Sequence, residues 1–309
     1  MSKSAFLFPG QGSQSVGMMT GLDSEVVRTT FDEASATLGY DLWDVVCNGP
    51  EERLGETRIT QPALLSAGIA TWRAWKESGG DDPDYLAGHS LGEYSALVAA
   101  GSLSFTDAVA LVARRGELMQ QATPPGSGAM AAILGLDDEV LVTVCEDAAD
   151  GEVVSCANFN SPGQVVIAGD AEAVARASDA ALQAGARRAI PLAVSVPSHC
   201  MLMKPAADEL AIVLESVLIE NPRIPVLHNV DTTFAGSDDE IRSALVNQLW
   251  MPVRWSETVQ RLVAEDVGRF VECGPGKVLT GLNRRICRGC EGIALTDMQT
   301  LKNTLDTWS

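Results

Sequence analysis

The residues Gly88, Ser90 and Gly92 form a Gly-x-Ser-x-Gly sequence, typical of a serine nucleophile held at a sharp turn between a strand and a helix. The glycines fit this interpretation because such a turn leaves little room for side chains beside the serine. The turn would expose the Ser90 hydroxyl at a helix N-terminus, where the backbone N–H of Leu91 is free to donate to a developing oxyanion. An ordinary glycine-flanked turn can carry the same five residues by chance, so other residues must decide between the two.

A serine hydroxyl is a weak nucleophile until a base removes its proton, and histidine is the usual base. The sequence contains only three histidines, at positions 89, 199 and 228. His89 adjoins Ser90, but at such a turn its side chain should point away from the serine hydroxyl. His228 lies beside an expected strand at 225–227. His199 lies in a loop, and we therefore favour it as the general base over a purely structural, hydrogen-bonded ring.

Arg115 is the third residue with chemical potential, because it falls on the apolar face of an expected helix that ends near residue 121. A buried cation is costly unless it meets an anion. One possible partner is an internal carboxylate, which would make a structural ion pair. The other is the carboxylate of a substrate, which a planar guanidinium can bind through two parallel hydrogen bonds.

The elements that must position these residues indicate an α/β fold. Short apolar runs at 5–8, 84–87 and 269–273 are expected strands, and helices are expected at 23–47 in two pieces, at 60–76 with Pro62 in the first turn, and at 91–100. A Gly-rich loop at 10–14 follows the first strand, where open α/β sheets border their ligand crevice. After a linker at 123–128, the expected order βαββαβ is that of a ferredoxin-like unit, which predicts a small domain inserted into a larger one.

Composition excludes several classes of function. The formal charge of −19 on 309 residues disfavours nucleic acids and anionic membranes as partners. No run of 18 apolar residues predicts a membrane span, and the first residues lack the apolar core of a secretory signal. The seven cysteines show no paired metal-ligand spacing, so we expect no metal, two reduced thiols at Cys287 and Cys290, and a cytoplasmic location.

Six short motifs, taken in order, resemble the malonyl-coenzyme A:acyl carrier protein transacylases of bacterial fatty-acid synthesis over about residues 5 to 286. The motifs are Phe8–Gln14, Gly88–Ser95, Arg115–Gln120, Asn158–Gln164, Val196–His199 and Gln248–Val253. The resemblance implies a discontinuous α/β hydrolase-like catalytic domain over 1–125 and 196–309, with a ferredoxin-like subdomain over 126–195. It also implies transfer of a malonyl group from malonyl-coenzyme A to acyl carrier protein, with no cofactor.

The resemblance assigns roles to residues of this chain. Ser90 would be the malonylated nucleophile and His199 the acid and base, with the His199 ring oriented by the backbone carbonyl at Gln248. The backbone N–H groups of Gln11 and Leu91 would form the oxyanion hole. Arg115 would bind the malonyl carboxylate. The remaining residues expected to line the substrate site are Gln248, Asn160 and Ser198, of which Ser198 would bear on the choice between malonyl and methylmalonyl groups.

Other functions stay open at this point. A serine esterase or thioesterase would share the nucleophile and the base but would not explain Arg115. A polyketide-type malonyl or methylmalonyl transferase, or a non-catalytic subunit that docks a carrier protein, is also compatible with the motifs. We expect a monomer. Because an acidic carrier must dock on an acidic enzyme, we expect a local basic surface made of Arg187, Arg188, Lys277, Arg284 and Arg285.

Overall fold

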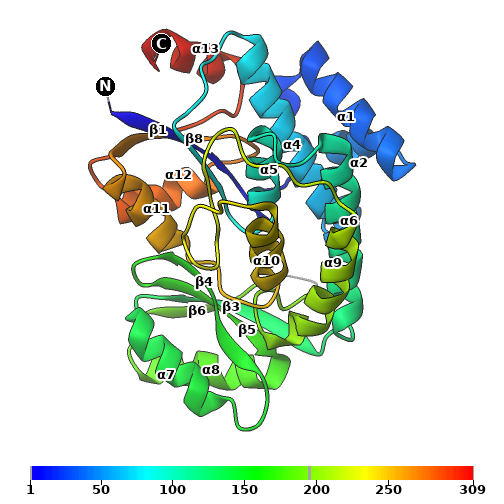
Figure 1. The fold of residues 1–309 in the computed structure, drawn as a ribbon. Helices are drawn as coiled ribbons and strands as arrows, with labels where there is room; N and C mark the ends of the chain where they lie inside the picture. Colours follow the sequence, from blue (N-terminus) through cyan, green and yellow to red (C-terminus); the bar gives the residue numbers. More distant parts are fainter. Residues whose placement is uncertain (1, 194–195, 309) are drawn as a thin grey trace.

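A five-stranded parallel sheet forms the centre of the larger part of the molecule in the computed structural model, which describes residues 2–193 and 196–308 (Figure 1). Its strand order is β7-β2-β1-β8-β9, and every neighbouring pair is parallel. The central strand β1 is apolar because helices cover both faces of the sheet. The strands are β1 (Lys3–Phe8), β2 (Tyr85–Gly88), β7 (Val226–Leu227), β8 (Val267–Glu272) and β9 (Glu291–Ala294).

Two hydrophobic clusters cover the two faces of this sheet. Phe6 and Phe8 of β1 belong to the larger cluster, while their neighbours Ala5 and Leu7 belong to the other, as the alternation of side chains along a strand requires. On the Ala5 and Leu7 side lie α11 (Trp255–Ala264) and α12 (Val278–Ile286). The larger cluster takes up α1 (Glu25–Leu38), α2 (Leu42–Asn48), α3 (Glu51–Leu54), α4 (Thr57–Glu77), α5 (Gly92–Ala99), α6 (Phe105–Ala122), α9 (Lys204–Glu215), α10 (Asp238–Gln248) and α13 (Met298–Trp308).

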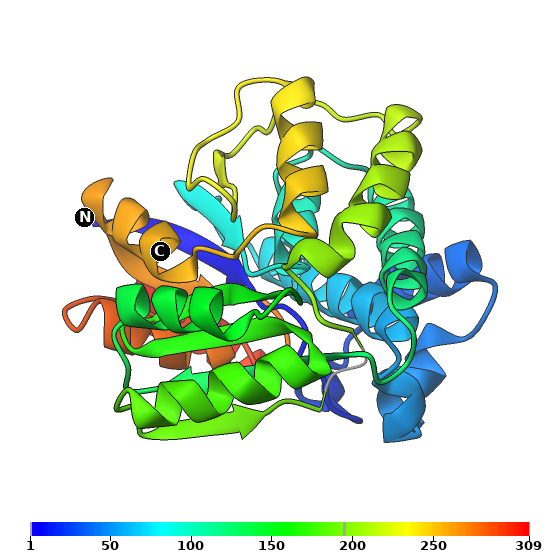
Figure 2. The same ribbon diagram turned by 90° about the horizontal axis from the view of Figure 1, so that it is seen from below.

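A separate four-stranded antiparallel sheet follows the linker, in the order β4-β5-β3-β6. Figures 1 and 2 show its two helices on one face, and they enclose a hydrophobic cluster of their own. The opposite face turns toward the parallel-sheet part. The chain order is β3 (Gly128–Leu134), α7 (Asp138–Ala148), β4 (Val154–Ser161), β5 (Gln164–Asp170), α8 (Ala171–Gln183) and β6 (Arg188–Pro191). The predicted combination of an α/β fold with two sheets is therefore confirmed.

The structure differs from the sequence predictions in three places. Helix α4 begins at Thr57, so Pro62 lies inside it and not in its first turn; burial of nearly every residue of this helix outweighs the missing backbone donor. Cys287 and Cys290, expected as thiols, are joined by a disulfide at the end of α12. Helices α3, α11 and α13 and strand β9 were not predicted.

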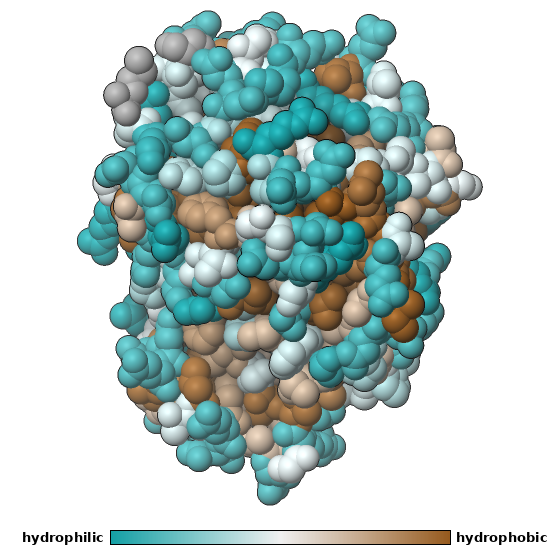
Figure 3. All heavy atoms as spheres, in the orientation of Figure 1, coloured by the Kyte–Doolittle hydropathy of each residue, from teal (hydrophilic) through white to brown (hydrophobic). Residues whose placement is uncertain are grey.

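The surface agrees with the composition. Hydrophilic side chains cover most of the face drawn in Figure 3, with smaller apolar patches between them. Among the described residues, no helix is both long and apolar enough to cross a bilayer.

Candidate active site

Ser90 lies in the turn between β2 and α5, in a backbone conformation that few residues other than glycine adopt. Its φ angle is +52°. A Cβ atom added to Gly88 would lie 1.9 Å from the carbonyl carbon of Gly92, and one added to Gly92 would lie 1.9 Å from the carbonyl oxygen of Phe8. Both positions therefore require glycine, and the predicted strand–serine–helix turn is present.

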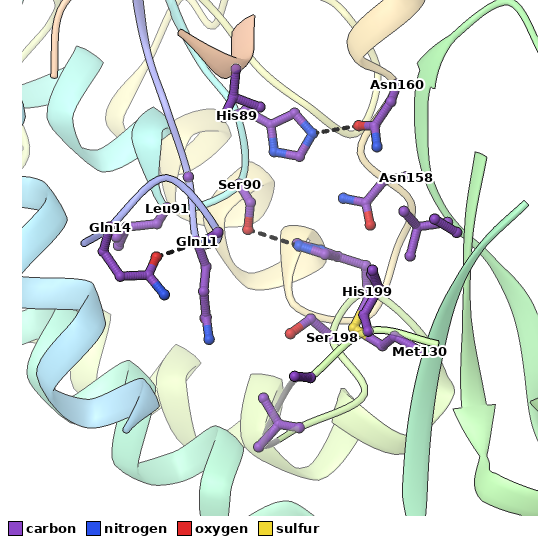
Figure 4. Close-up of a pocket in the computed structure, with 18 of the residues that line it drawn as sticks. Gln11, Gln14, His89, Ser90, Leu91, Met130, Asn158, Asn160, Ser198 and His199 are labelled. Atoms are coloured by element: carbon purple, nitrogen blue, oxygen red, sulfur yellow. Dashed lines mark hydrogen bonds between the residues drawn. The ribbon is translucent and has the colours of Figure 1, made fainter. Parts of the chain in front are cut away.

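His199 accepts a hydrogen bond from the nucleophile and is held in place by a backbone carbonyl. Its Nε2 lies 2.8 Å from the Oγ of Ser90 (Figure 4). Its Nδ1 lies 2.6 Å from the carbonyl oxygen of Gln248. A carbonyl oxygen can only accept, so Nδ1 carries the proton and the Nε2 lone pair faces the serine hydroxyl. The pair thus has the geometry for proton abstraction without a carboxylate on the histidine.

The protonation state of His199 suits a base. Burial disfavours the charged imidazolium, the positive charge of Arg115 adds to this effect, and together they lower the pKa of His199 to about 3. The ring is therefore neutral near pH 7.

Arg115 is buried with no carboxylate bonded to it. Its side chain is 1% exposed; Nη1 donates to Oε1 of Gln61 at 2.9 Å, and Nη2 donates to Oε1 of Gln248 at 3.0 Å. Its Nε has no hydrogen-bond partner, and none of the ion pairs among the described residues involves it. The interpretation of Arg115 as half of an internal ion pair is therefore wrong. Burial lowers its pKa, and the ring of Tyr94, 5.4 Å from the guanidinium carbon, adds a cation–π contact.

Gln11 and Leu91 meet at the nucleophile from two different elements. Gln11 lies in the loop after β1, and Leu91 is the residue just before α5. Neither backbone N–H has a hydrogen-bond partner within the part of the chain that the structure describes. The loop is held by the Gly12 N–H, which donates to Oε1 of Gln14 at 2.7 Å (Figure 4). Two free donors beside Ser90 are what an oxyanion hole requires.

A buried carboxylate behind the nucleophile was not predicted to have a role. Glu93 is fully buried in the first turn of α5. Its Oε1 lies 2.7 Å from Nδ1 of His228, and its Oε2 accepts from the backbone N–H of Asn229 at 2.9 Å and from Nε2 of Gln248 at 2.8 Å. Burial alone would lower the pKa of His228, but the charge and hydrogen bond of Glu93 outweigh it and raise that pKa.

The residues bonded to Glu93 hold the peptide groups around Ser90. The Oδ1 of Asn229 accepts from the Ser90 N–H at 2.6 Å, and its Nδ2 donates to the Gly88 carbonyl at 2.7 Å. The Nε2 of Gln248 donates to the Ser90 carbonyl at 3.0 Å. Glu93 thereby holds in place the two side chains, Asn229 and Gln248, that bond to the strained backbone of Ser90. The only sequence signal for it is a carboxylate three residues after the nucleophile, which says nothing about its partners.

One cavity of about 470 Å³ brings most of the predicted residues together. Its wall includes Gln11, Ser90, Leu91, Arg115, Asn160, Ser198 and His199, together with apolar residues of the antiparallel sheet such as Met130, Ala132 and Val166. Gln248 is not part of the wall; it is fully buried behind it and reaches the site through its hydrogen bonds.

A hydrogen bond joins His89, which follows β2 of the parallel sheet, to Asn160 in β4 of the antiparallel sheet. The Nε2 of His89 lies 2.8 Å from Oδ1 of Asn160, and Figure 4 shows the imidazole turned away from the Ser90 hydroxyl, as predicted. Asn160 thus faces the cavity with its amide oxygen already engaged. No group of three or more potential metal ligands occurs among the described residues.

Comparison with known proteins identifies the family. The model of the acyl transferase domain matches residues 5–296. The malonyl CoA-acyl carrier protein transacylase of Escherichia coli K12 is 54% identical over 308 residues, covering 99% of this chain and 100% of its own. The one from Haemophilus influenzae is 56% identical over 301 residues, covering 96% of each.

Solved structures agree. A malonyl-transacylase in a holo complex with its type II PKS acyl-carrier protein superposes with a TM-score of 0.98 at 55% identity, covering 99% of this chain and 100% of that one. The acyl carrier protein S-malonyltransferase of Vibrio cholerae gives 0.96 at 56% identity, covering 98% and 100%. With a serine–histidine pair and an unpaired arginine in one cavity, the chain belongs to the malonyl CoA-acyl carrier protein transacylases of the acyl transferase domain family.

Proposed function

We propose that this chain moves a malonyl group from coenzyme A to the phosphopantetheine thiol of acyl carrier protein, through a malonyl ester on Ser90. The observation that carries the proposal is Arg115: a buried guanidinium with no bonded carboxylate, in the same cavity as the Ser90–His199 pair. A thioester with a free carboxylate at its far end matches both features at once.

In the first half of the cycle, Ser90 is acylated. The Nε2 of His199 takes the hydroxyl proton while Oγ bonds to the thioester carbonyl carbon. The resulting oxyanion lies between the backbone N–H groups of Gln11 and Leu91, where loss of one donor typically costs about 100- to 1000-fold in rate. Collapse breaks the carbon–sulfur bond, and coenzyme A leaves with the proton from His199.

In the second half, the roles of His199 reverse. It accepts the proton of the carrier's thiol as sulfur attacks the malonyl-Ser90 carbonyl. The carbon–oxygen bond then breaks, and the proton returns to Oγ of Ser90. The family resemblance and the relatives' names support this ping-pong order. It is also consistent with a single neutral His199 that acts as base and then as acid in each half of the cycle.

The contacts of Arg115 suggest how the malonyl carboxylate affects the base. Two guanidinium N–H groups donate to neutral amides, which a carboxylate can displace at a gain, because hydrogen bonds between two charged groups are the stronger ones. The bound carboxylate also offsets the positive charge that lowers the pKa of His199. Malonyl binding would therefore make His199 a stronger base than it is in the empty site.

The acyl-enzyme mass tests the proposal. After mixing with malonyl-coenzyme A, intact-protein mass spectrometry should show one malonyl adduct, absent in Ser90→Ala, and holo-carrier protein should remove it with formation of malonyl-carrier. Free malonate as the sole product, with no transfer to the carrier, would establish a hydrolase instead. Carrier binding with neither adduct nor product would indicate a docking subunit.

A second candidate differs only in acyl group or carrier. A relative with 55% identity was solved with a type II PKS acyl-carrier protein, which favours polyketide synthesis as a second destination for the malonyl group. Ser198 lines the cavity beside His199, where the α-carbon of the acyl group would lie. Competition between malonyl- and methylmalonyl-coenzyme A for Ser90 would show which group is accepted.

The carrier-docking surface is part of the same proposal. Lys277 and Arg284, at the two ends of α12, are exposed and form no ion pair among the described residues. In the Lys277→Glu/Arg284→Glu double variant the KM for an acidic carrier should rise while acylation by malonyl-coenzyme A stays unchanged. An unchanged carrier KM would remove these two residues from the surface.

The finer description of the fold also stays a proposal. The separate cluster enclosed by α7 and α8 supports treating 126–195 as a ferredoxin-like subdomain, and the parallel sheet with helices on both faces supports a hydrolase-like catalytic domain over 1–125 and 196–309. A monomer without a cofactor, working in the cytoplasm, fits this activity. Light scattering of the purified protein would test the monomer.

A further inference from the structure

A second cavity, of about 520 Å³, is lined by three arginines. Arg187 and Arg188 come from the start of β6, and Arg285 comes from the last turn of α12. The rest of the wall is the β3–α7 and β4–β5 turns, through Leu134, Gly135, Pro162 and Gly163. None of the three arginines pairs with a carboxylate among the described residues, although the chain has 41 acidic residues against 22 basic ones.

The turns bring the arginines together by close packing. The backbone N–H of Gly135 donates to the Gly163 carbonyl at 2.7 Å, which ties the two turns to each other. A Cβ atom on Gly135 would lie 2.7 Å from Cγ of Arg187, so only the lack of a side chain at Gly135 lets the Arg187 side chain pack here. Nη1 of Arg285 donates to Oε1 of Gln164, which holds this side chain against the antiparallel sheet.

This cavity continues the acyl cavity along one face of β3. Met130 and Ala132 line the acyl cavity, and Leu134, the next residue on the same face, lines the arginine cavity. On β5, Gln164 pairs with Leu134; it lines the acyl cavity and accepts from Arg285. At about 3.3 Å per residue, the path from Met130 to Leu134 is about 13 Å long.

We propose that Arg187, Arg188 and Arg285 form a phosphate subsite at the far end of this path, a proposal that rests on the proposed transferase function. Unpaired guanidinium groups around one cavity suit a phosphate ester, which they bind through charge-assisted, often bidentate hydrogen bonds. In both substrates an extended amide arm joins the reacting sulfur to a phosphate: the diphosphate of coenzyme A and the phosphodiester that links the arm to the carrier. The apolar and amide face of β3 and β5 accommodates such an arm.

The subsite would explain how one site serves two substrates of different size, the donor malonyl-coenzyme A and the acceptor carrier protein. The nucleotide and the carrier protein lie beyond the phosphate, so the enzyme need only recognise what the two substrates share. Coenzyme A and the carrier's arm would occupy the same arginines in turn, and free coenzyme A would compete with the carrier.

The test uses donors that differ in phosphate content. Malonyl transfer to Ser90 is measured with malonyl-coenzyme A, malonyl-3′-dephospho-coenzyme A and malonyl-pantetheine, which has no phosphate. Because the arginines are exposed, each substitution to Gln should raise the KM for malonyl-coenzyme A by about two- to fivefold, and Arg187→Gln/Arg285→Gln together by about tenfold. The KM for malonyl-pantetheine and kcat should not change. Arg288→Gln, an exposed arginine just beyond α12, is the matched control.

The three donors and the carrier show which phosphate the arginines bind. A KM effect that persists with the 3′-dephospho donor and extends to holo-carrier supports the shared diphosphate or phosphodiester position. An effect lost with that donor would place the 3′-phosphate of coenzyme A at the arginines and overturn the shared position. An equal KM increase for malonyl-pantetheine, or an increase for the carrier alone, overturns the subsite. Failure of the unsubstituted protein to form malonyl-Ser90 from any donor would overturn the proposed transferase function instead.

Discussion

Replacing Arg115 by methionine should separate malonyl from acetyl transfer. The substitution keeps a long, buried side chain but removes the charge and every N–H that can reach a substrate carboxylate. A hydrogen bond between charged groups contributes about 1.5–3 kcal/mol, so loss of even one should slow malonyl transfer by about 10- to 150-fold. Acetyl transfer, which offers no carboxylate, should change much less.

The same substitution should move the pH profile in a defined direction. Burial lowers the pKa of His199 to about 3, and the charge of Arg115 is the second cause. The base is active when neutral, so the rate falls as pH drops through this pKa. Without the arginine charge the pKa of His199 rises, and the acid limb of the profile should move to higher pH.

Stopped-flow or quench-flow acylation of Ser90 with malonyl- and acetyl-coenzyme A, from about pH 3 to 8, measures both effects. Acetyl-coenzyme A is the better probe of the pH shift, because it lacks a carboxylate of its own. Arg115→Lys is the matched control: it restores the charge but not the planar pair of donors, so it should restore the pH profile more fully than malonyl transfer. Equal loss of both acyl groups with an unmoved acid limb would refute the reasoning.

Three further outcomes follow from the contacts around the nucleophile. Glu93→Gln replaces one carboxylate oxygen by an amide NH₂ group, which donates and cannot accept. The amide then faces either His228 or the two donors of Asn229 and Gln248, so the free energy of unfolding, measured by denaturant titration, should fall by about 3–5 kcal/mol. Because the pKa of His228 is raised in the folded protein, protonated His228 stabilises the fold fully below the unfolded pKa of histidine, about 6.5. This stabilisation is lost as pH rises through the higher pKa of the folded state, and His228→Gln should abolish this decline in the free energy of unfolding. Gly92→Ala should abolish folding or acylation, because its Cβ would lie 1.9 Å from the Phe8 carbonyl oxygen, whereas Gly281→Ala, with open space around it, should be neutral or stabilising by up to about 1 kcal/mol; similar behaviour of the two glycine variants would contradict the packing argument.

The residues that the sequence identified are those with a local signal. Ser90 lies between two glycines, and Arg115 interrupts an apolar stripe whose helical period is readable without any tertiary information. His199 was selected among only three histidines. The fold class followed similarly, because strand runs and a proline–glycine linker are local features.

The residues that it missed act through contacts between distant parts of the chain. Glu93 meets Asn229 and Gln248, which are 136 and 155 residues away in sequence. Nothing in the spacing of a buried carboxylate says which backbone N–H will reach it. The prediction for Cys287 and Cys290 was wrong for a different reason: their spacing was interpreted as that of two reduced thiols, whereas the structure joins them by a disulfide.

The place of Glu93 accounts for how Arg115 stays charged without being neutralised. A carboxylate bonded directly to the guanidinium would offset its desolvation but would also occupy the N–H groups that a substrate needs. Here the Oε2 of Glu93 bonds to Nε2 of Gln248, and the Oε1 of the same amide accepts from Arg115. The negative charge therefore acts on Arg115 across one neutral side chain, where it opposes the lowering of the pKa by burial. Because the bonded partners are amides, a substrate carboxylate is the first full negative charge that the guanidinium can bind directly, and we propose that this favours acyl groups that carry one.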